Sequence, residues 1–465
     1  MRMATSCLSF ALVFGLVAGC SPASSTDQTE EGLLLPSKAT RIAVVGAGPS
    51  GLMAAYTLKQ QGYQHVTVFE KNNRVGGKVN SFHSGSNISE LGAVFASPDY
   101  TLVLGLADKF HIPYTAYTLG QSILDEHGQK QSFESFLTSR YSTLQILGAV
   151  VSYGAALTLF SGINRNGFAL QLPDLYLPMN QFAQKYGFAP IAELVKSIMI
   201  GFGYGYYETA PALYFMKLMG WLVKIGGPMG LTPATYYTFP TGFQSIWDSV
   251  AAGLDVRLNS EVTNIVRRNV FAPSRVQVAV NGGALQDFDA VIISAPLNKV
   301  SGFMTLTAEE TQLFTQVLNE RYFVSLYGAG GITPEEALFF YDNARPAGIN
   351  HVNVWANRDH TSPLFVGYQI ADYTTPAAQI TNILAQDVAS QGGAFGGLLL
   401  RQEWPEYFPH VTTETLSQGF YERVELLQGK NNVFYVGGTL SFETVEHSAR
   451  YAQELVQKNF PTPLF

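Results

Sequence analysis

The stretch "RIAVVGAGPSGL", residues 41–52, decides the fold of the nucleotide-binding part of this chain. An apolar, β-branched run leads directly into glycines at positions 46, 48 and 51, and the following "LMAAYTLKQQG" has helix-forming residues with a glycine just past its end. A further strand-like run, "HVTVF", ends immediately before Glu70, about 20 residues beyond the glycines. This strand–turn–helix–strand pattern predicts a unit that binds a dinucleotide.

Each glycine in this turn has a physical role. Gly46 makes the turn, Gly48 lets the backbone approach a pyrophosphate, and Gly51 lets the helix pack closely on the strand. The N-terminus of the helix faces the negative charge of the phosphates, and the carboxylate of Glu70 is expected to accept hydrogen bonds from the ribose hydroxyls.

The composition favours an apolar ligand cavity or a membrane-facing surface. Only 14% of the 465 residues are charged, while 47% are hydrophobic and 13% aromatic. Typical soluble domains have about a quarter charged residues. The formal net charge of −7 argues against a nucleic-acid partner. The length predicts more than one domain.

The first 20 residues predict a secretory signal. The apolar run from Leu8 to Val17 is too short to span a bilayer, and "VAGC" at 17–20 resembles the bacterial lipobox, in which the cysteine is acylated. We therefore expect lipidation of Cys20, a polar tether over 21–39, and a membrane-anchored protein of the bacterial cell envelope. Because Ser21 rather than an acid follows the cysteine, the outer membrane facing the periplasm is the expected location. The alternative is a buried N-terminal helix with a chance cysteine.

Neither cysteine is then available for a disulfide, a zinc site or nucleophilic catalysis. Cys7 would leave with the signal, and Cys20 would be modified.

A second uncharged stretch covers residues 142–163, between Arg140 and Arg165. Its length meets the criterion for a membrane-spanning helix. That interpretation is rejected because it would put the flanking nucleotide-binding segments on opposite sides of a membrane. Two interpretations stay open, a buried helix and a surface that dips into lipid.

Five dispersed blocks together resemble the flavin amine oxidase superfamily: "VVGAGPSGL", "FEKNNRVGGK", "ELGA", "VIISAPL" and "FYVGGT" followed by a helix. Within that superfamily the chain is similar to the FAD-dependent polyunsaturated fatty acid double-bond isomerases. That similarity rests on "LPMNQFAQKYGF", "GFGYGYYETAPALYFMKLM" and "EWPEYFPHVTTETLSQGFYERVELLQG". The resemblance implies FAD as cofactor.

The fold class implied is α/β, with a Rossmann-like FAD-binding domain, built from a parallel sheet and a small antiparallel sheet, and a discontinuous mixed or helical substrate domain. The expected order is FAD-binding parts at 40–115, 235–310 and 395–465, and substrate-domain parts at 116–234 and 311–394. The runs "VRLNSEVTNIVRR", "SRVQVAV" and "DAVIISAPL" are expected strands that return to the FAD-binding part.

Matching the motifs position by position assigns the cofactor contacts. Lys78 is expected to offer a point positive charge to the diphosphate. The complete set of expected cofactor-binding residues is Gly46, Gly48, Pro49, Ser50, Gly51, Glu70, Lys71, Gly77, Lys78, Gly92, Ala93, Val262, Gly437, Gly438, Thr439 and Val445.

Three positions depart from the family pattern. Gly438 stands where the superfamily has an acid in its C-terminal turn, so a backbone group or Thr439 is expected to substitute. Phe442 is nearest to the position of a cage tyrosine. The isomerases bind the fatty-acid carboxylate with an arginine, and the alignment places Gly120 or Gln121 there. Gln121 can hydrogen-bond a carboxyl, ester or amide but cannot form a bidentate ion pair.

The resemblance implies removal of a hydride from the carbon between two double bonds and its return to one end of the delocalised cation, giving a conjugated diene. Such a reaction needs a dry, aromatic tunnel rather than an acid–base pair. Phe202 and Phe442 are the expected catalytic-site residues, and Gln121, Tyr204, Trp404 and Tyr407 the expected substrate contacts. Further aromatic candidates are Tyr206 and Tyr207, while His410 is interpreted as a structural hydrogen-bonding residue.

The function predicted is an FAD-dependent hydride-transfer enzyme on an apolar unsaturated lipid, foremost a polyunsaturated fatty acyl double-bond isomerase. The first alternative is a flavin oxidoreductase of amine-oxidase or desaturase type. The second is a non-catalytic flavin- and lipid-binding lipoprotein. No metal is expected, and the sequence does not indicate an oligomeric state.

Overall fold

The computed structural model describes residues 37–463, apart from positions 86, 119, 171, 222–234, 269–274, 359 and 361. The described residues belong to one compact unit. Cys7, Cys20, the expected signal peptide and the tether up to residue 36 lie outside the described residues, so their assignment stays a prediction.

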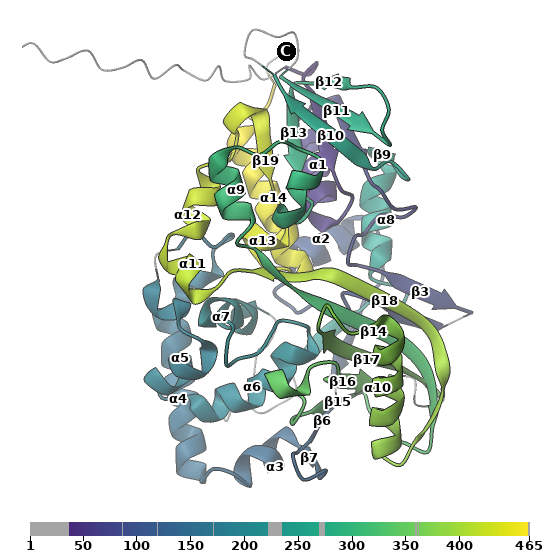
Figure 1. Ribbon diagram of the computed structural model, residues 1–465, viewed down its shortest axis with the longest axis vertical. Coiled ribbons are helices and arrows are strands. Elements are labelled where there is room, and N and C mark those ends of the chain that lie inside the picture. Colours follow the sequence, from purple (N-terminus) through teal and green to yellow (C-terminus); the bar gives the residue numbers. More distant parts are fainter. Residues whose placement is uncertain are drawn as a thin grey trace, which may run out of the picture. The chain divides into compact units, whose positions relative to one another are not determined.

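A five-stranded parallel sheet carries the motif of residues 41–52 (Figure 1). Its strand order is β19 (Val433–Tyr435), β13 (Ala290–Ile293), β1 (Arg41–Val45), β2 (His65–Phe69) and β9 (Asp255–Arg257). Strand β1 is central, and its four residues after Arg41 are apolar and buried, as expected for a parallel strand that is covered on both faces. Helices α1 (Pro49–Gln60) and α14 (Val445–Asn459) pack against each other beside it. The predicted strand–turn–helix–strand unit is confirmed.

A small antiparallel sheet lies beside this parallel sheet (Figure 1). It contains β10 (Val262–Arg267), β11 (Val276–Val280) and β12 (Gln286–Phe288). The α/β class, with one parallel and one small antiparallel sheet, is therefore as the sequence predicts.

The other half of the molecule is built on a seven-stranded sheet. Its order is β18 (Ala394–His410), β14 (Leu318–Gly330), β17 (Leu364–Ala371), β16 (Val354–Ala356), β15 (Ala337–Phe340), β6 (Gln121–Leu124) and β7 (Lys130–Ser132). Strand β18 pairs with β14 from Ala394 to His410. This sheet therefore extends to residue 410, beyond the boundary at 394 expected for the second substrate-domain part.

Helices complete both halves. Those on the seven-stranded half are α3 (Phe133–Thr138), α4 (Thr143–Leu159), α5 (Met179–Lys185), α6 (Ala189–Gly201), α7 (Ala212–Trp221) and α10 (Ala377–Ser390). The other α-helices are α2 (Thr101–Lys109), α8 (Gln244–Ala252), α9 (Ala308–Phe314), α11 (Thr413–Ser417), α12 (Phe420–Glu425) and α13 (Gly438–Ser441).

Short elements connect these. The remaining strands are β3 (Ser81–Ser84), β4 (Asn87–Glu90), β5 (Thr115–Thr118) and β8 (Thr235–Thr238), and the 3-10 helices are η1 (Ser161–Asn164), η2 (Pro173–Tyr176), η3 (Leu297–Gly302), η4 (Pro346–Gly348) and η5 (Lys430–Asn432).

The uncharged stretch 142–163 forms α4, which is only half buried. Ser142 begins the helix through a reciprocal capping box with Gln145. Ile146 is buried on the inner face, whereas Leu144 is 82% exposed and Val151 73% exposed. The expectation of a fully buried helix is therefore wrong for the outer face. Among the described residues, no helix meets the length and hydropathy needed to cross a membrane.

Candidate active site

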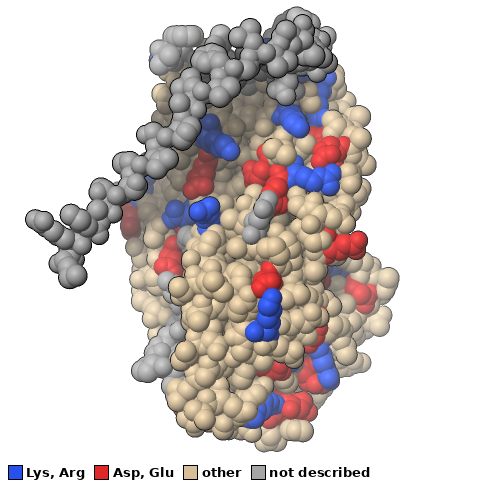
Figure 2. Space-filling model, turned by 90° about the vertical axis from the view of Figure 1, so that its left-hand side faces the viewer, with Lys and Arg blue, Asp and Glu red and all other residues tan. Residues whose placement is uncertain are grey.

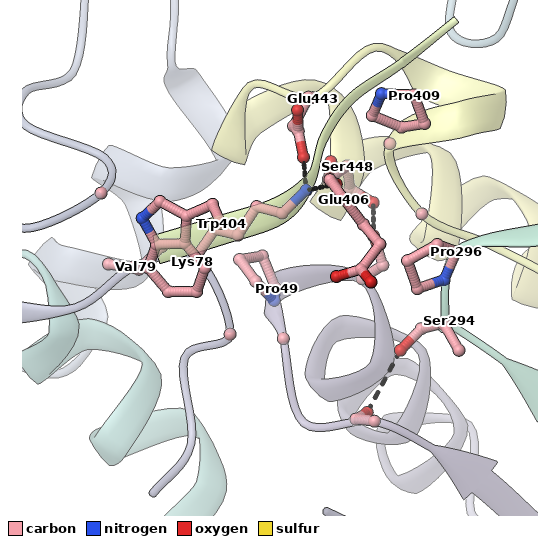
Figure 3. A pocket seen from close by; sticks show the side chains of 18 of the residues that line it. Pro49, Lys78, Val79, Ser294, Pro296, Trp404, Glu406, Pro409, Glu443 and Ser448 are labelled. Carbon is pink, nitrogen blue, oxygen red and sulfur yellow. Dashed lines mark hydrogen bonds and ion pairs between the residues drawn. The ribbon is translucent and has the colours of Figure 1, made fainter. Parts of the chain in front are cut away.

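A cavity of about 810 Å³ opens at the carboxyl ends of the parallel strands. Its lining includes the residues that directly follow β1, β2, β13 and β19, together with residues 402–407 of β18. Ligands of open α/β sheets bind at this edge. Figure 3 shows that residues far apart in sequence, such as Pro49, Pro296 and Trp404, surround the same space.

The expected cofactor-binding residues converge on this cavity. All of them line it except Gly51, and the lining members are Gly46, Gly48, Pro49, Ser50, Glu70, Lys71, Gly77, Lys78, Gly92, Ala93, Val262, Gly437, Gly438, Thr439 and Val445. A Cβ at Gly51 would lie 2.0 Å from the carbonyl oxygen of Gly46. This close approach confirms the expected packing role of Gly51, and only its inclusion among the cofactor-binding residues is corrected.

Gly48, unlike Gly51, has room for a side chain within the protein, and this room tests whether a dinucleotide fits the site. Its backbone has an ordinary φ of −76°, and a Cβ there would meet only the Cα of Gly77, at 3.8 Å. The protein's own packing therefore does not require a glycine at position 48. A glycine that the fold does not need, on the wall of a cavity at a helix N-terminus, fits close approach of a bound pyrophosphate.

Glu70 is buried at the cavity and braces the glycine turn. One carboxylate oxygen accepts a hydrogen bond from the backbone N–H of Ala47 at 2.8 Å, and the other accepts one from the N–H of Asn72 at 2.9 Å. The oxygen that accepts from Asn72 also accepts from the side-chain amide of that residue, at 2.6 Å, so only the oxygen that accepts from Ala47 keeps a free acceptor site for a ribose hydroxyl. The expected role of Glu70 is compatible with this geometry.

Lys78 is not free to act as a simple phosphate ligand. Its ammonium group donates to the carboxylate of Glu443 and, at 2.5 Å, to the backbone carbonyl of Glu406 (Figure 3). Burial lowers the pKa of Lys78, and the nearby carboxylate of Glu406 opposes that shift. The lysine thus ties the second glycine turn to the C-terminal turn on the wall of the cavity.

Glu443 is a site residue that the sequence analysis missed. A Cβ at Gly438 would lie 3.3 Å from the Cβ of Glu443. Glu443 therefore places a carboxylate-bearing residue beside position 438. Thr439 and Gly438 also line the cavity, so the expected substitution by a backbone group or Thr439 stays a prediction. The sequence feature that could have identified Glu443 is an acidic residue five positions after Gly438, directly before the N-cap of α14.

Aromatic rings form one end of the cavity. The ring of Phe202 lies 5.9 Å from that of Phe95 and 6.3 Å from that of Tyr204, which stacks on Tyr407 at 5.9 Å. Trp404 completes this wall and donates from its indole N–H to the carbonyl of Leu91 at 2.8 Å. Four of these rings were expected from the sequence. Phe95 and Tyr100 were missed because they lie in an irregular segment without a recognisable motif.

The phenols on this wall stay neutral. Burial raises the pKa of Tyr100, Tyr204 and Tyr407 well above the ordinary value of 10. The aromatic end therefore presents weakly polar hydroxyl groups and rings rather than an ionised base.

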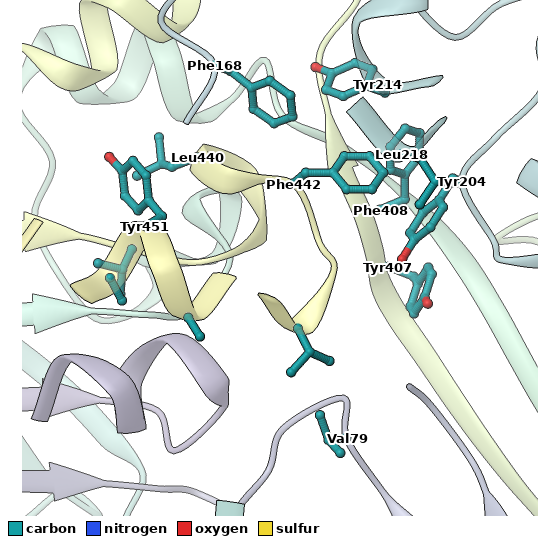
Figure 4. Close-up of a cluster of buried hydrophobic side chains, with 14 of the residues drawn as sticks. Val79, Phe168, Tyr204, Tyr214, Leu218, Tyr407, Phe408, Leu440, Phe442 and Tyr451 are labelled. Atoms are coloured by element: carbon teal, nitrogen blue, oxygen red, sulfur yellow. The ribbon is translucent and has the colours of Figure 1, made fainter. Parts of the chain in front are cut away.

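Phe442 does not line the cavity, and its assignment as a catalytic-site residue is corrected. It is 1% exposed and packs behind Tyr204, with 4.9 Å between ring centroids (Figure 4). Its φ of +77° and ψ of 150° belong to a region that side-chain-bearing residues rarely adopt. The position shapes the turn that carries Glu443.

Three other candidates also lie outside the described lining. Gln121 begins β6 and pairs with Ala337 of β15, so its expected contact with the substrate head group is corrected. The hydroxyl of Tyr207 donates to Glu193 at 2.9 Å, and Tyr206 is buried away from the cavity wall.

His410 is a structural residue. Its Nδ1 hydrogen-bonds the carbonyl of Phe408 at 2.7 Å, and its ring stacks on Phe408 at 4.4 Å. Burial lowers the pKa of His410 to about 4, so the ring is neutral at pH 7.

The carboxylates of β18 and the C-terminal turn that line the cavity are paired with cations. Glu403 lies 2.8 Å from Arg321, Glu406 lies 3.1 Å from Lys299, and Glu443 pairs with Lys78. These acids are therefore already neutralised and do not form an open site for a positively charged ligand.

Comparison with known proteins agrees with this architecture. The family described as flavin containing amine oxidoreductase matches residues 49–330. The crystal structure of a fatty acid isomerase from P. acnes that produces CLA superposes with a TM-score of 0.83, at 26% identity, covering 91% of this chain and 99% of that one.

Two curated relatives cover most of the chain as well. The FAD-dependent oxidoreductase oblC of Cochliobolus heterostrophus is 25% identical, with 94% of each chain covered. The polyenoic fatty acid isomerase of Ptilota filicina is 21% identical, covering 90% of this chain and 95% of that protein. The family match spans more than half of the chain. The glycine turn after β1 and the cavity at the carboxyl ends of the strands fit the cofactor. This protein is therefore an FAD-dependent enzyme of the flavin-containing amine oxidoreductase family.

Proposed function

We propose that this protein isomerises a polyunsaturated fatty acyl chain, moving one double bond to give a conjugated diene without net oxidation. One observation carries the proposal. The aromatic end of the cavity offers rings and neutral phenols, and the carboxylates next to it are paired with cations. An apolar chain fits such a wall.

The similarity to a CLA-producing isomerase over 91% of the chain supports the same substrate class. The polyenoic fatty acid isomerase relative adds to that support. A family member that acts on an amine would need a recognition site for an alkylammonium group. Here Glu403, Glu406 and Glu443 already have cationic partners, which disfavours such a ligand.

Bound FAD supplies a centre that accepts a hydride and can return it. The chain's own residues do the rest. Gly48 and the N-terminus of α1 are positioned to hold the pyrophosphate, and Glu70 to hold the ribose. Phe95, Phe202 and Tyr204 exclude water from the reacting carbons and hold the extended chain. A low-polarity, water-free wall prevents capture of a delocalised cation by water.

The second candidate is a flavin oxidoreductase that passes electrons to oxygen or another acceptor. Its support is the FAD-dependent oxidoreductase relative, which matches 94% of this chain. A flavin- and lipid-binding protein without turnover is the third.

Anaerobic incubation of the holoenzyme with a panel of polyunsaturated acids and esters separates these functions. We expect conjugated-diene absorbance to rise while the flavin absorbance is unchanged. Stoichiometric bleaching of the flavin by substrate would instead identify the oxidoreductase. If no substrate of the panel gives either diene absorbance or flavin bleaching, only the non-catalytic function remains and the proposal is overturned.

A further inference from the structure

Helix α4 carries an apolar stripe on its outer surface. Leu144 is 82% exposed, Leu147 41%, Val151 73% and Leu159 65%. Their spacing places them on one face, at intervals of three, four and eight residues. Among the described residues only ten large hydrophobic side chains are this exposed, and four of them lie on this one helix. The stripe is therefore a local feature rather than the usual scatter of surface leucines.

The helix that carries the stripe is itself uncharged. Residues 141–164 contain no Asp, Glu, Lys or Arg. Figure 2 shows this side of the molecule, where wide areas carry neither acidic nor basic groups. At the N-terminal end Arg140 is paired with Glu126, and at the C-terminal end Arg165 is exposed, with no carboxylate at ion-pair distance among the described residues.

We infer that this outer face of α4 rests in the surface of a lipid bilayer, with Leu144, Leu147, Val151 and Leu159 below the head groups and Arg165 at the level of the lipid phosphates. A helix lying in the interface buries one apolar face in this way without crossing the membrane. The inner face of α4, with Ile146, Ala149, Tyr153 and Ala156, packs on the protein.

The size of the stripe favours lipid over a second copy of the chain. A 17-residue helix is about 25 Å long and about 10 Å wide, so its exposed stripe covers about 250 Å². A stable dimer buries about 800 Å² on each partner. One helix face is thus too small for such an interface, whereas lipid contact needs no complementary protein surface.

The position of α4 connects this face to the cavity. Helix α4 packs on α6, and Phe202, which follows the last residue of α6, lines the aromatic end of the cavity. This inference rests in part on the proposed function, because an enzyme that takes acyl chains gains from a face that contacts the bilayer in which such chains reside.

A label on the stripe tests the inference directly. The full-length holoprotein with Cys7→Ser and Cys20→Ser has no cysteine, so a single Val151→Cys can carry an environment-sensitive dye. With vesicles of phosphatidylcholine and phosphatidylglycerol, we expect a blue shift of its emission and quenching by nitroxide-labelled phospholipids. The matched control is a dye at Leu399→Cys, because Leu399 is 53% exposed and lies on β18 rather than on α4. The control dye is expected to show neither change.

Vesicle co-sedimentation gives an independent readout. The pair Leu144→Glu and Val151→Glu should lower partitioning at least tenfold, while Leu399→Glu should leave it unchanged. An unshifted dye at position 151 in the presence of vesicles overturns the inference. A dye at position 151 that is already shielded without vesicles also overturns the inference. Light scattering then identifies what covers the face: a dimer assigns it to a second copy of the chain, and a monomer assigns it to the chain's own N-terminal segment. Neither readout uses catalysis, so vesicle insertion without diene formation contradicts the proposed function alone.

Discussion

Lys78 and Glu443 form an ion pair on the wall of the cofactor cavity, although 365 residues separate them in the chain. The pair joins the glycine turn after β2 to the turn before α14, and Glu443 also accepts the backbone N–H of Phe408. It places one positive and one negative group beside the cofactor site. Both charges are therefore expected to act on the electronics of the bound flavin.

Replacing either partner of this pair should shift the flavin reduction potential in opposite directions. Glu443→Gln removes a negative charge and should raise the potential, while Lys78→Met removes a positive charge and should lower it, each by on the order of 30 mV, which corresponds to about 1.4 kcal/mol for two electrons. Dye-linked reductive titration measures the change. Shifts of the same sign would contradict the placement of the pair at the flavin.

Gly48→Ala should abolish or strongly weaken FAD binding without unfolding the protein. The added methyl group meets only the Cα of Gly77 at 3.8 Å, so it occupies ligand space. Gly51→Ala is the contrasting variant, because its methyl group would collide with the carbonyl of Gly46. Flavin content after purification and thermal unfolding of the apoprotein measure the two effects. A Gly48→Ala protein that retains FAD with unchanged affinity would show that the pyrophosphate lies elsewhere.

Tyr204→Phe should retain diene formation within a few-fold of the parent rate. Burial raises the pKa of the Tyr204 phenol far above neutrality, so the hydroxyl is not a base and the ring is the useful part. Tyr204→Ala, which removes the ring from the wall, should reduce the rate much more. The measurement is the initial rate across pH 6 to 9. Loss of a hundredfold or more in Tyr204→Phe would instead reveal proton transfer through this hydroxyl.

At position 442 glycine should be more stable than alanine, the reverse of their usual order. Phe442 has φ +77°, a conformation that costs side-chain-bearing residues about 1–3 kcal/mol. Both Phe442→Gly and Phe442→Ala lose the buried ring, so their difference isolates the backbone strain. Denaturant unfolding should place the glycine variant about 1–2 kcal/mol above the alanine variant. Equal stabilities would indicate that the turn relaxes.

The contribution of His410 to stability should fall on acidification between pH 6.5 and 4, while the raised pKa values of the buried Glu90 and Glu320 act in the opposite direction. The pKa of His410 is about 4 in the folded protein, against an ordinary value of 6.5. Between these values the unfolded chain binds more protons than the folded one, so lowering the pH favours unfolding, by up to about 3 kcal/mol for this group. His410→Asn should flatten this dependence. Burial also lowers the pKa of His447, which keeps its own contribution in the variant. An unchanged slope would contradict the assignment to His410.

The parallel sheet and the cofactor-facing glycines were predictable because local sequence dictates them. A glycine turn between an apolar strand and a helix has one common structural solution, and the acid after β2 follows at a fixed spacing. Trp404 and Tyr407 were expected on the cavity wall only through the resemblance to the isomerase family, and both line the cavity.

Other features depend on contacts between distant segments. The approach of Glu443 to Gly438 follows from the path of a turn that contains Phe442 at φ +77°, and no sequence periodicity reveals that path. The expected substrate contact of Gln121 was wrong because its position in a sequence alignment does not show whether its side chain on β6 reaches the cavity. The half-exposed state of α4 was likewise hidden, since an uncharged sequence looks the same whether protein or lipid covers its outer face.

The central claim is that a hydride leaves and returns within one substrate molecule. A mixture of unlabelled polyunsaturated acid and acid deuterated at the carbon between its double bonds, incubated anaerobically with the holoenzyme, tests it most directly. The account predicts that the deuterated acid gives dienes that keep all of their deuterium and that the unlabelled acid gives dienes with none, with the flavin absorbance unchanged at the end. Dienes that have lost the deuterium to water, or one bleached flavin for each product formed, would contradict it.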